Sequence, residues 1–251
     1  MDTEIASGVL RLELVDPAGH CTLDGPRLRA AADRLADTGH PPRVVLLTHP
    51  GPNFCVGGDV RAFAAADEPG KYVASVAAEF HRAIRALVAS PAPVIAVIRG
   101  WAAGAGMSIV AASDIAIASS GARFRPGYPG IGFSPDGGLT WTLPRAIGRA
   151  RAFDILLRDR VIDAPQALAL GLVSEVVDGA ELDAYAQQVA EDIATGPVNA
   201  FARVKALINA GGLASFDEQL DAEATAIAES ADHPEGREGV RAFMERRRPQ
   251  F

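Results

Sequence analysis

Two glycine-rich segments of this sequence could present backbone N–H groups to an anion. The first, at residues 52–59, reads PNFCVGGD, and the second, at residues 100–106, reads GWAAGAG. Each follows an apolar β-type run and precedes a predicted helix, so its backbone can approach a ligand closely and offer unpaired N–H groups. Two such donors on one oxygen would stabilise an enolate, the anion that forms when a carbon acid loses a proton. Either segment alone could also be only a tight strand-to-helix turn.

A third segment, GFSPDGG at residues 132–138, places Asp136 at the entry to a predicted helix over 139–147. A single carboxylate can take a proton from one carbon and return it to another while N–H donors hold the enolate. The structural alternative is a helix N-cap, which Asp in this position would also suit. Asp59 and Asp114 are expected to be a helix cap and a structural residue at the start of a strand.

These segments need a framework, and the sequence predicts an α/β fold for it. Strands over 9–15, 44–48, 94–98 and 114–119 alternate with helices over 27–38 and 71–90, a rhythm typical of a largely parallel sheet. After a last strand at 174–177, the pattern predicts only helices, over 182–195, 198–209, 216–230 and 235–247. We therefore expect a core over residues 1–195 and a C-terminal helical region over 196–251, to which the resemblance described below assigns oligomerisation.

Composition excludes several functional classes. The chain has 251 residues, 49% of them hydrophobic, and a net charge of -7, which argues against nucleic-acid binding. It has no apolar run of the roughly 20 residues that span a membrane and no targeting pattern, which favours a cytoplasmic protein. Cys21 and Cys55 have neither metal-ligand nor disulfide spacing. The segment at 104–106 lacks the spacing of a dinucleotide or phosphate loop.

Together with residues 124–145 and the run EGVRAFMER at 238–246, the three segments resemble the crotonase (enoyl-CoA hydratase/isomerase) superfamily. The resemblance implies a spiral of ββα units with a C-terminal helical trimerisation region, and hence a homotrimer or homohexamer. It implies an acyl-CoA substrate, with no separate cofactor and no metal. It also implies that the N–H groups of Gly58 and Ala105 form an oxyanion hole. The residues implied to contact CoA are Phe54, Val56, Arg248 and Phe251, although the basic C-terminus could equally be a solvated tail.

The resemblance also bears on the reaction. Hydratases of the superfamily use two glutamates, and this chain has Ser108 and Tyr128 at the matching positions. Asp136 matches the acid of Δ3,Δ2-enoyl-CoA, dienoyl-CoA and epoxyphenylacetyl-CoA isomerases. We therefore predict an isomerase that moves a double bond from Δ3 to Δ2, with Asp136 as the proton shuttle. We expect the substrate pocket to include Ser108, Tyr128, Phe133 and Trp141, and we expect a structural role for His81.

Three other functions remain open at this point. The chain could be a ring-opening isomerase of the epoxyphenylacetyl-CoA type. It could also be an aryl-CoA dehalogenase in which Asp136 is the nucleophile, or an acyl-CoA-binding protein without activity. The orientation of the Asp136 carboxylate, either into the thioester pocket or onto its own helix as a cap, separates catalysis from binding alone.

Overall fold

The structure is a computed structural model that describes residues 3–5, 8–16, 18, 20–49 and 51–251. Its main sheet has six strands, which lie in the spatial order β1 (Thr3–Ile5), β2 (Val9–Leu12), β3 (Val44–Leu47), β4 (Val94–Ile98), β6 (Ile115–Ser119) and β9 (Glu175–Val177). Every neighbouring pair is parallel except β1 and β2. The predicted parallel sheet is therefore confirmed. Strand β4 has the predicted bounds, β3, β6 and β9 are each one residue shorter than predicted, and β2 ends at Leu12 and not at residue 15.

A second sheet of three short strands was not predicted. It consists of β5 (Trp101–Ala103), β7 (Arg123–Arg125) and β8 (Ile162–Asp163), in the order β5-β7-β8. The chain passes from β4 of the main sheet to β5 of the second and then into helix α4 (Ala105–Ala112). It passes in the same way from β6 to β7. This repeated step between two sheets is the ββα arrangement that the sequence led us to expect.

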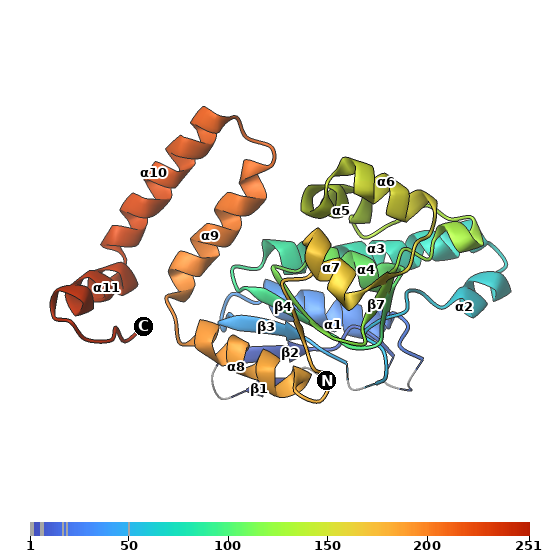
Figure 1. The fold of residues 1–251 in the computed structure, drawn as a ribbon, viewed down its shortest axis with the longest axis horizontal. Helices are drawn as coiled ribbons and strands as arrows, with labels where there is room; N and C mark the ends of the chain where they lie inside the picture. The colour runs from blue at the N-terminus through green and yellow to red at the C-terminus, as the bar shows by residue number, and fades with distance from the viewer. Residues whose placement is uncertain (1–2, 6–7, 17, 19, 50) are drawn as a thin grey trace.

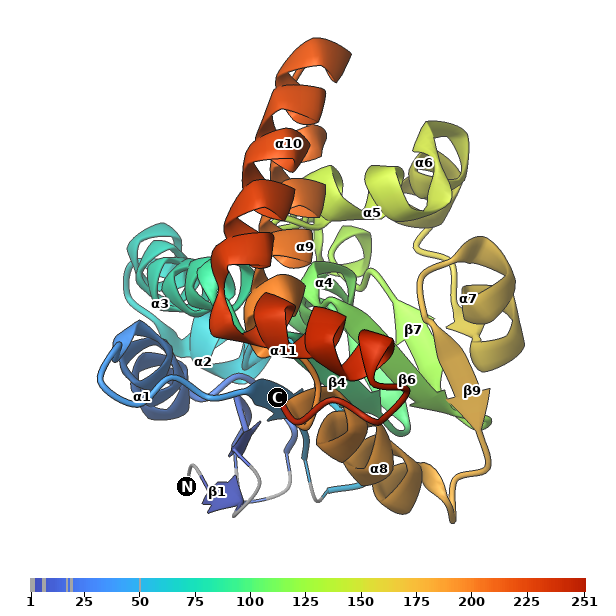
Figure 2. The ribbon, with the colours of Figure 1, turned by 90° about the vertical axis from the view of Figure 1, so that its left-hand side faces the viewer.

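Helices cover both faces of the main sheet (Figures 1 and 2). Leu10 and Leu12 of β2 point to the face that α1 (Gly25–Ala36), α3 (Pro69–Ala89) and α4 cover. Val9 points to the opposite face, which α8 (Leu182–Ala194) covers with a row of small buried residues. This alternation follows from the two-residue period of a strand. Both cysteines, Cys21 and Cys55, are buried in the interior.

The remaining core helices are α2 (Val60–Ala65), the 3-10 helix η1 (Pro129–Ile131), α5 (Leu139–Ile147), α6 (Arg149–Leu157) and α7 (Ala164–Leu170). Of these, α7 packs against the second sheet. Helix α5 has the predicted bounds and buries Leu139, Leu143 and Ile147. Among the described residues, no helix is long and apolar enough to cross a membrane.

The last three helices, α9 (Val198–Gly211), α10 (Phe216–Asp232) and α11 (Pro234–Met244), extend away from the sheets (Figure 1). They and the turn between α9 and α10 expose many large apolar side chains, including Ile208, Leu213, Phe216, Ile227, Val240, Phe243 and Met244. The predicted boundary at residues 195–196 falls in the turn between α8 and α9.

Lys205, on α9, attaches this helical layer to the core. Its Nζ donates to the carbonyl oxygens of Leu87 (2.9 Å) and Ala92 (3.1 Å) and lies 2.8 Å from Oδ2 of Asp114. The same carboxylate oxygen accepts the N–H of Val94 at 2.7 Å. Asp114 therefore has the structural role that we predicted for it.

Replacing Lys205 by Met should lower the free energy of unfolding by about 2–3 kcal/mol, to be measured by urea denaturation. Breaking a fully buried ion pair costs about 3–5 kcal/mol because one charge is left unpaired. The cost should be smaller here because the Asp114 side chain is 26% exposed. Lys71→Met is the matched control: Lys71 pairs with Glu68 on the surface, and its loss should change stability by less than about 0.5 kcal/mol. Equal effects of the two substitutions would contradict the prediction.

Candidate active site

The two glycine-rich turns lie side by side. The N–H of Cys55 donates to the carbonyl of Trp101 (3.1 Å), and the carbonyl of Cys55 accepts the N–H of Ala103 (2.8 Å). Beyond this pairing the backbones stay close: a Cβ added to Gly57, where φ is +100°, would lie 3.7 Å from the nitrogen of Ala105. The structure thus brings together two turns that are about 45 residues apart in sequence.

Gly58 and Ala105 offer unpaired N–H groups at this junction. Within the part of the chain that the structure describes, neither group donates to another protein atom. Ala105 is the first residue of α4, and its N-cap, Gly104, has no side chain to satisfy the first N–H groups of the helix. Unpaired N–H groups at a helix N-terminus attract negative charge. The pair is therefore suited to hold an oxyanion.

Both residues line a cavity of about 670 Å³ between α2, α3 and the turn before η1. Four other residues from the sequence prediction line it as well: Val56, Tyr128, Phe133 and Asp136. Most of the remaining lining is apolar, from Leu23, Val60, Phe63, Val73, Val76, Phe80 and Ile131. Among the described residues that line the cavity, Asp136 is the one with an acidic side chain.

The Asp136 side chain does not cap a helix. The N-cap of α5 is Gly138, and α5 has no side-chain cap. Instead, the hydroxyl of Tyr128 donates to Oδ1 of Asp136 at 2.8 Å. The expected cap is found at Asp59, whose carboxylate accepts two N–H groups of α2. Of the two readings of Asp136, the geometry supports the one in which it faces the cavity.

Tyr128 is a hydrogen-bond donor in this site at neutral pH. Burial, and after it the negative charge of Asp136, raises the pKa of the Tyr128 phenol far above its ordinary value. The phenol therefore stays protonated and can donate a hydrogen bond to the carboxylate.

His81 is a neighbour of Asp136 that the sequence analysis missed. Its Nε2 accepts the N–H of Gly137 (3.1 Å) and lies 3.5 Å from Oδ2 of Asp136. We had expected a purely structural role for His81. The local sequence carries no signal for this contact, because His81 lies on α3, 55 residues before Asp136 in the chain.

Three predicted pocket or CoA residues lie elsewhere. Ser108 is fully buried behind the cavity, where α4 is packed against the interior. The Trp141 ring lies on a separate groove of about 950 Å³ beside α9, where the guanidinium of Arg145 covers it at 3.7 Å. Phe54 is buried in the hydrophobic core, because its backbone pairs with the segment before β5 and turns the ring inward. None of the three lines the cavity that contains Asp136.

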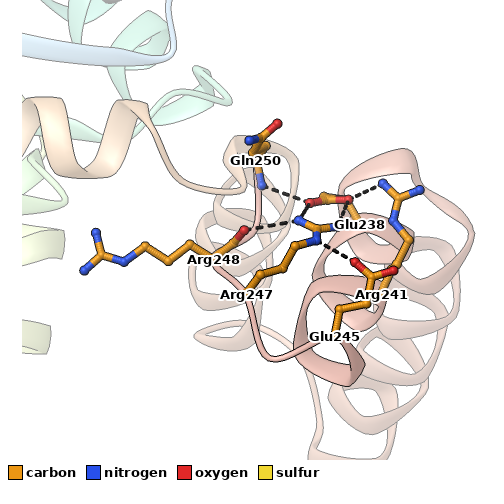
Figure 3. A network of polar contacts seen from close by, with 6 residues as sticks. All are labelled: Glu238, Arg241, Glu245, Arg247, Arg248 and Gln250. Atoms are coloured by element: carbon orange, nitrogen blue, oxygen red, sulfur yellow. Dashed lines mark hydrogen bonds and ion pairs between the residues drawn. The ribbon is translucent and has the colours of Figure 1, made fainter.

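The end of the chain is folded back on α11. Two guanidinium nitrogens of Arg247 donate to Glu238 (2.6 and 3.0 Å), as do Arg241 and the backbone N–H of Gln250 (Figure 3). These donors stabilise the ionised carboxylate and hold the pKa of Glu238 far below its ordinary value. The tail is therefore an ordered segment and not a loose basic extension.

This arrangement sets the position of Arg248 and Phe251, two predicted CoA contacts. The Phe251 ring packs against Gly239, where an added Cβ would lie 3.7 Å from it. The Arg248 side chain extends away from the Glu238 cluster (Figure 3). Neither residue lines the cavity of its own chain. A contact with CoA in that cavity would require the tail of another subunit.

Comparison with known proteins agrees with this geometry. Residues 4–251 match the family model described as "Enoyl-CoA hydratase/isomerase". The chain belongs to this family, the crotonase superfamily. This crotonase is 38% identical over 217 residues to 1,2-epoxyphenylacetyl-CoA isomerase of Escherichia coli, covering 83% of this chain and 80% of the relative. It is 37% identical over 209 residues to a protein of Rhodobacter capsulatus named "Probable enoyl-CoA hydratase", with the same coverage.

The fold comparison is equally direct. The crystal structure of an enoyl-CoA hydratase from a Polaromonas species superposes with a TM-score of 0.93 at 33% identity and covers 100% of this chain and 98% of that one. The crotonase described here therefore has the α/β fold with two sheets and C-terminal helices. Its chemistry is of the acyl-CoA hydratase/isomerase type, and its relatives include both hydratases and isomerases.

Proposed function

We propose that this crotonase is an acyl-CoA isomerase that moves a double bond from Δ3 to Δ2, with Asp136 as its proton shuttle. One observation carries the proposal. The cavity that contains the N–H groups of Gly58 and Ala105 has a single acidic side chain among its described lining residues, that of Asp136. One carboxylate is sufficient for a 1,3-proton shift, whereas hydration calls both for a group that takes a proton from water and for a group that delivers a proton to carbon 2 of the substrate.

The proposed reaction has two steps. Asp136 takes a proton from carbon 2 of a 3-enoyl thioester, and the electron pair of the broken C–H bond moves onto the thioester oxygen. The N–H groups of Gly58 and Ala105 stabilise the resulting dienolate. The proton on Asp136 then returns to carbon 4, the double bond forms between carbons 2 and 3, and the carboxylate is regenerated.

The residues at the hydratase positions support this choice of reaction. Ser108 and Tyr128 match the positions at which hydratases of the superfamily hold glutamates. Neither hydroxyl is a base at neutral pH, because the pKa of the Tyr128 phenol is raised by burial and a serine hydroxyl is not acidic. Deprotonation of water would thus depend on Asp136 alone.

The experiment is a comparison of two reactions on one enzyme preparation. Isomerisation of 3-hexenoyl-CoA is followed by the rise in absorbance as the conjugated product forms. Hydration of crotonyl-CoA is followed by the fall in absorbance as its conjugated double bond is lost. We expect kcat/KM for isomerisation to exceed that for hydration at least about 100-fold, the contribution typical of one general acid–base group. Faster hydration than isomerisation would overturn the proposal.

An aromatic acyl group is a second candidate substrate. Three phenylalanine rings line the cavity, and two of them, Phe63 and Phe133, stack with centroids 6.3 Å apart. The third, Phe80, lies on α3. Aromatic rings favour contact with another ring. Ring-opening isomerisation of 1,2-epoxyphenylacetyl-CoA, the substrate in the name of the E. coli relative, should be tested in parallel.

We also propose that the region 196–251 assembles this crotonase into a homotrimer or homohexamer. The support is the number of large apolar side chains that α9 to α11 expose, among them Phe216, Ile227 and Phe243. In such an assembly Arg248 and Phe251 would contact the CoA of a neighbouring subunit. Light scattering at micromolar concentration should give three or six times the mass of one chain, and a stable monomer would contradict the assembly.

A further inference from the structure

Two hydroxyl groups hold Asp136 at two different atoms. The Tyr128 hydroxyl lies 2.8 Å from Oδ1, and the Ser108 hydroxyl lies 2.9 Å from the backbone carbonyl oxygen. The two hydroxyl oxygens are 3.2 Å from each other. Each hydroxyl has one hydrogen, and the two shorter distances assign both hydrogens to Asp136.

The second carboxylate oxygen, Oδ2, is left without a donor among the described residues. Nε2 of His81 lies 3.5 Å away, but it already accepts the N–H of Gly137 at 3.1 Å. The His81 ring therefore carries its hydrogen on Nδ1 and has none to donate from Nε2. This contact also fixes the backbone directly after Asp136.

We propose that Tyr128 and Ser108 are positioning residues that orient Asp136 so that Oδ2 is the oxygen that exchanges the proton with substrate. The inference rests on the proposed isomerase function and names residues that act through Asp136. A carboxylate rotates easily about its last side-chain torsion, which has broad minima. The Tyr128 hydrogen bond stops this rotation, and the Ser108 hydrogen bond fixes the backbone from which the side chain extends.

The arrangement also restricts the chemistry of the cavity. Because both hydroxyl hydrogens are committed to Asp136, neither Tyr128 nor Ser108 can donate to a water molecule without releasing the carboxylate. The two positions that hold glutamates in hydratases thus both act on Asp136. The same two hydrogen bonds therefore position Asp136 and favour isomerisation over hydration.

Tyr128→Phe tests the proposal. It removes the hydroxyl and keeps the ring, so kcat for isomerisation should fall on the order of 100-fold, as for a misplaced catalytic group. KM should stay within about twofold, because binding of the thioester does not use the hydroxyl. Ser108→Ala should cost about three- to tenfold in kcat, the effect of one neutral hydrogen bond. The double variant should lose less than the product of the two losses, because both residues act through Asp136.

Tyr185→Phe is the matched control. Tyr185, on α8, also donates its hydroxyl to a carboxylate, that of Glu175, but it lies outside the cavity. Its replacement removes the same kind of hydrogen bond, so any loss of kcat that comes only from reduced stability should appear in both variants. We expect Tyr185→Phe to keep the kcat of the unmodified protein.

A second measurement does not depend on turnover. Carbon-13 at Cζ of tyrosine reports hydrogen bonding of the phenol, and the chain has three tyrosines, so Tyr72→Phe and Tyr185→Phe, which each remove one resonance, assign the remaining one to Tyr128. Asp136→Asn should shift that resonance at neutral pH, because a charged acceptor becomes neutral, and should leave the Tyr185 resonance in place.

The two measurements separate the possible failures. A kcat of Tyr128→Phe equal to that of Tyr185→Phe, in an active isomerase, would overturn the positioning role and leave the proposed function standing. An unchanged Tyr128 resonance in Asp136→Asn would overturn the contact itself, even if Tyr128→Phe failed to fold. A shifted resonance in a protein that isomerises no enoyl-CoA would support the contact and refute the proposed function.

Discussion

Asp136→Asn is expected to lower kcat for isomerisation of 3-hexenoyl-CoA by about 10²- to 10⁴-fold, the contribution of a general acid–base group. Asn has nearly the same shape as Asp and can still accept the hydrogen bond of Tyr128, but its amide cannot take up a proton. Binding of the acyl-CoA, measured by calorimetry, should persist. Exchange of deuterium from solvent into the acyl chain should fall together with turnover, because both report the same proton abstraction.

Asp163→Asn is the control for this substitution. Asp163 caps α7 through the N–H of Gln166 and lies outside the cavity. Asn is as good an N-cap as Asp, so activity and stability should both be unchanged. If Asp136→Asn keeps the turnover and exchange of the Asp163 variant, Asp136 is not the base and the proposed mechanism fails.

Gly106→Ala should reduce kcat by about 10²- to 10³-fold, similar to the loss of one oxyanion donor. Gly106 lies on α4 directly beneath the first glycine-rich turn, and an added Cβ would lie 2.2 Å from the carbonyl oxygen of Cys55. Cys55 must then move away from α4, and Gly58, three residues further along, should move with it. The two N–H groups would no longer converge on one oxygen.

Gly121→Ala is the matched control, because it shows whether any Gly→Ala substitution lowers kcat or only the one at Gly106. An added Cβ at Gly121 meets nothing within 4 Å, so this variant should keep full activity. A crystal structure of Gly106→Ala should show the Cys55–Gly58 segment displaced. Full activity of Gly106→Ala would mean that the close approach of these two turns is not needed for catalysis.

The main sheet could be predicted from sequence because its strands are continuous apolar runs between recognisable helices, as at Val94–Ile98. The second sheet could not. Its strands β5, β7 and β8 have only two or three residues, as in Arg123–Arg125, which is too short for a period to be seen. The positions of these strands are set by tertiary contacts with the rest of the protein and not by the β-strand propensity of their own residues.

Some features of the candidate site could also be predicted from the sequence, and others could not. Asp136 and the two glycine-rich turns stand out because each belongs to a continuous segment. The contacts of Asp136 with Ser108 and His81 join segments 28 and 55 residues away, and no local pattern reports them. Trp141 was wrongly placed because closeness in sequence was taken as closeness in space. Two residues along a helix point about 200° apart, so a buried Leu139 leaves Trp141 on another face.

The burial of both cysteines has a practical consequence for labelling this protein. Cys21 and Cys55 are each at most 1% exposed, and burial raises the pKa of the Cys55 thiol to about 12. Because the thiolate is the form that attacks maleimides, Cys55 should not react in the folded protein at neutral pH. A new cysteine at an exposed position of α2, such as Arg61, should then be labelled selectively without removal of the native ones. A fluorophore there, beside the cavity, would report the entry of an acyl-CoA directly.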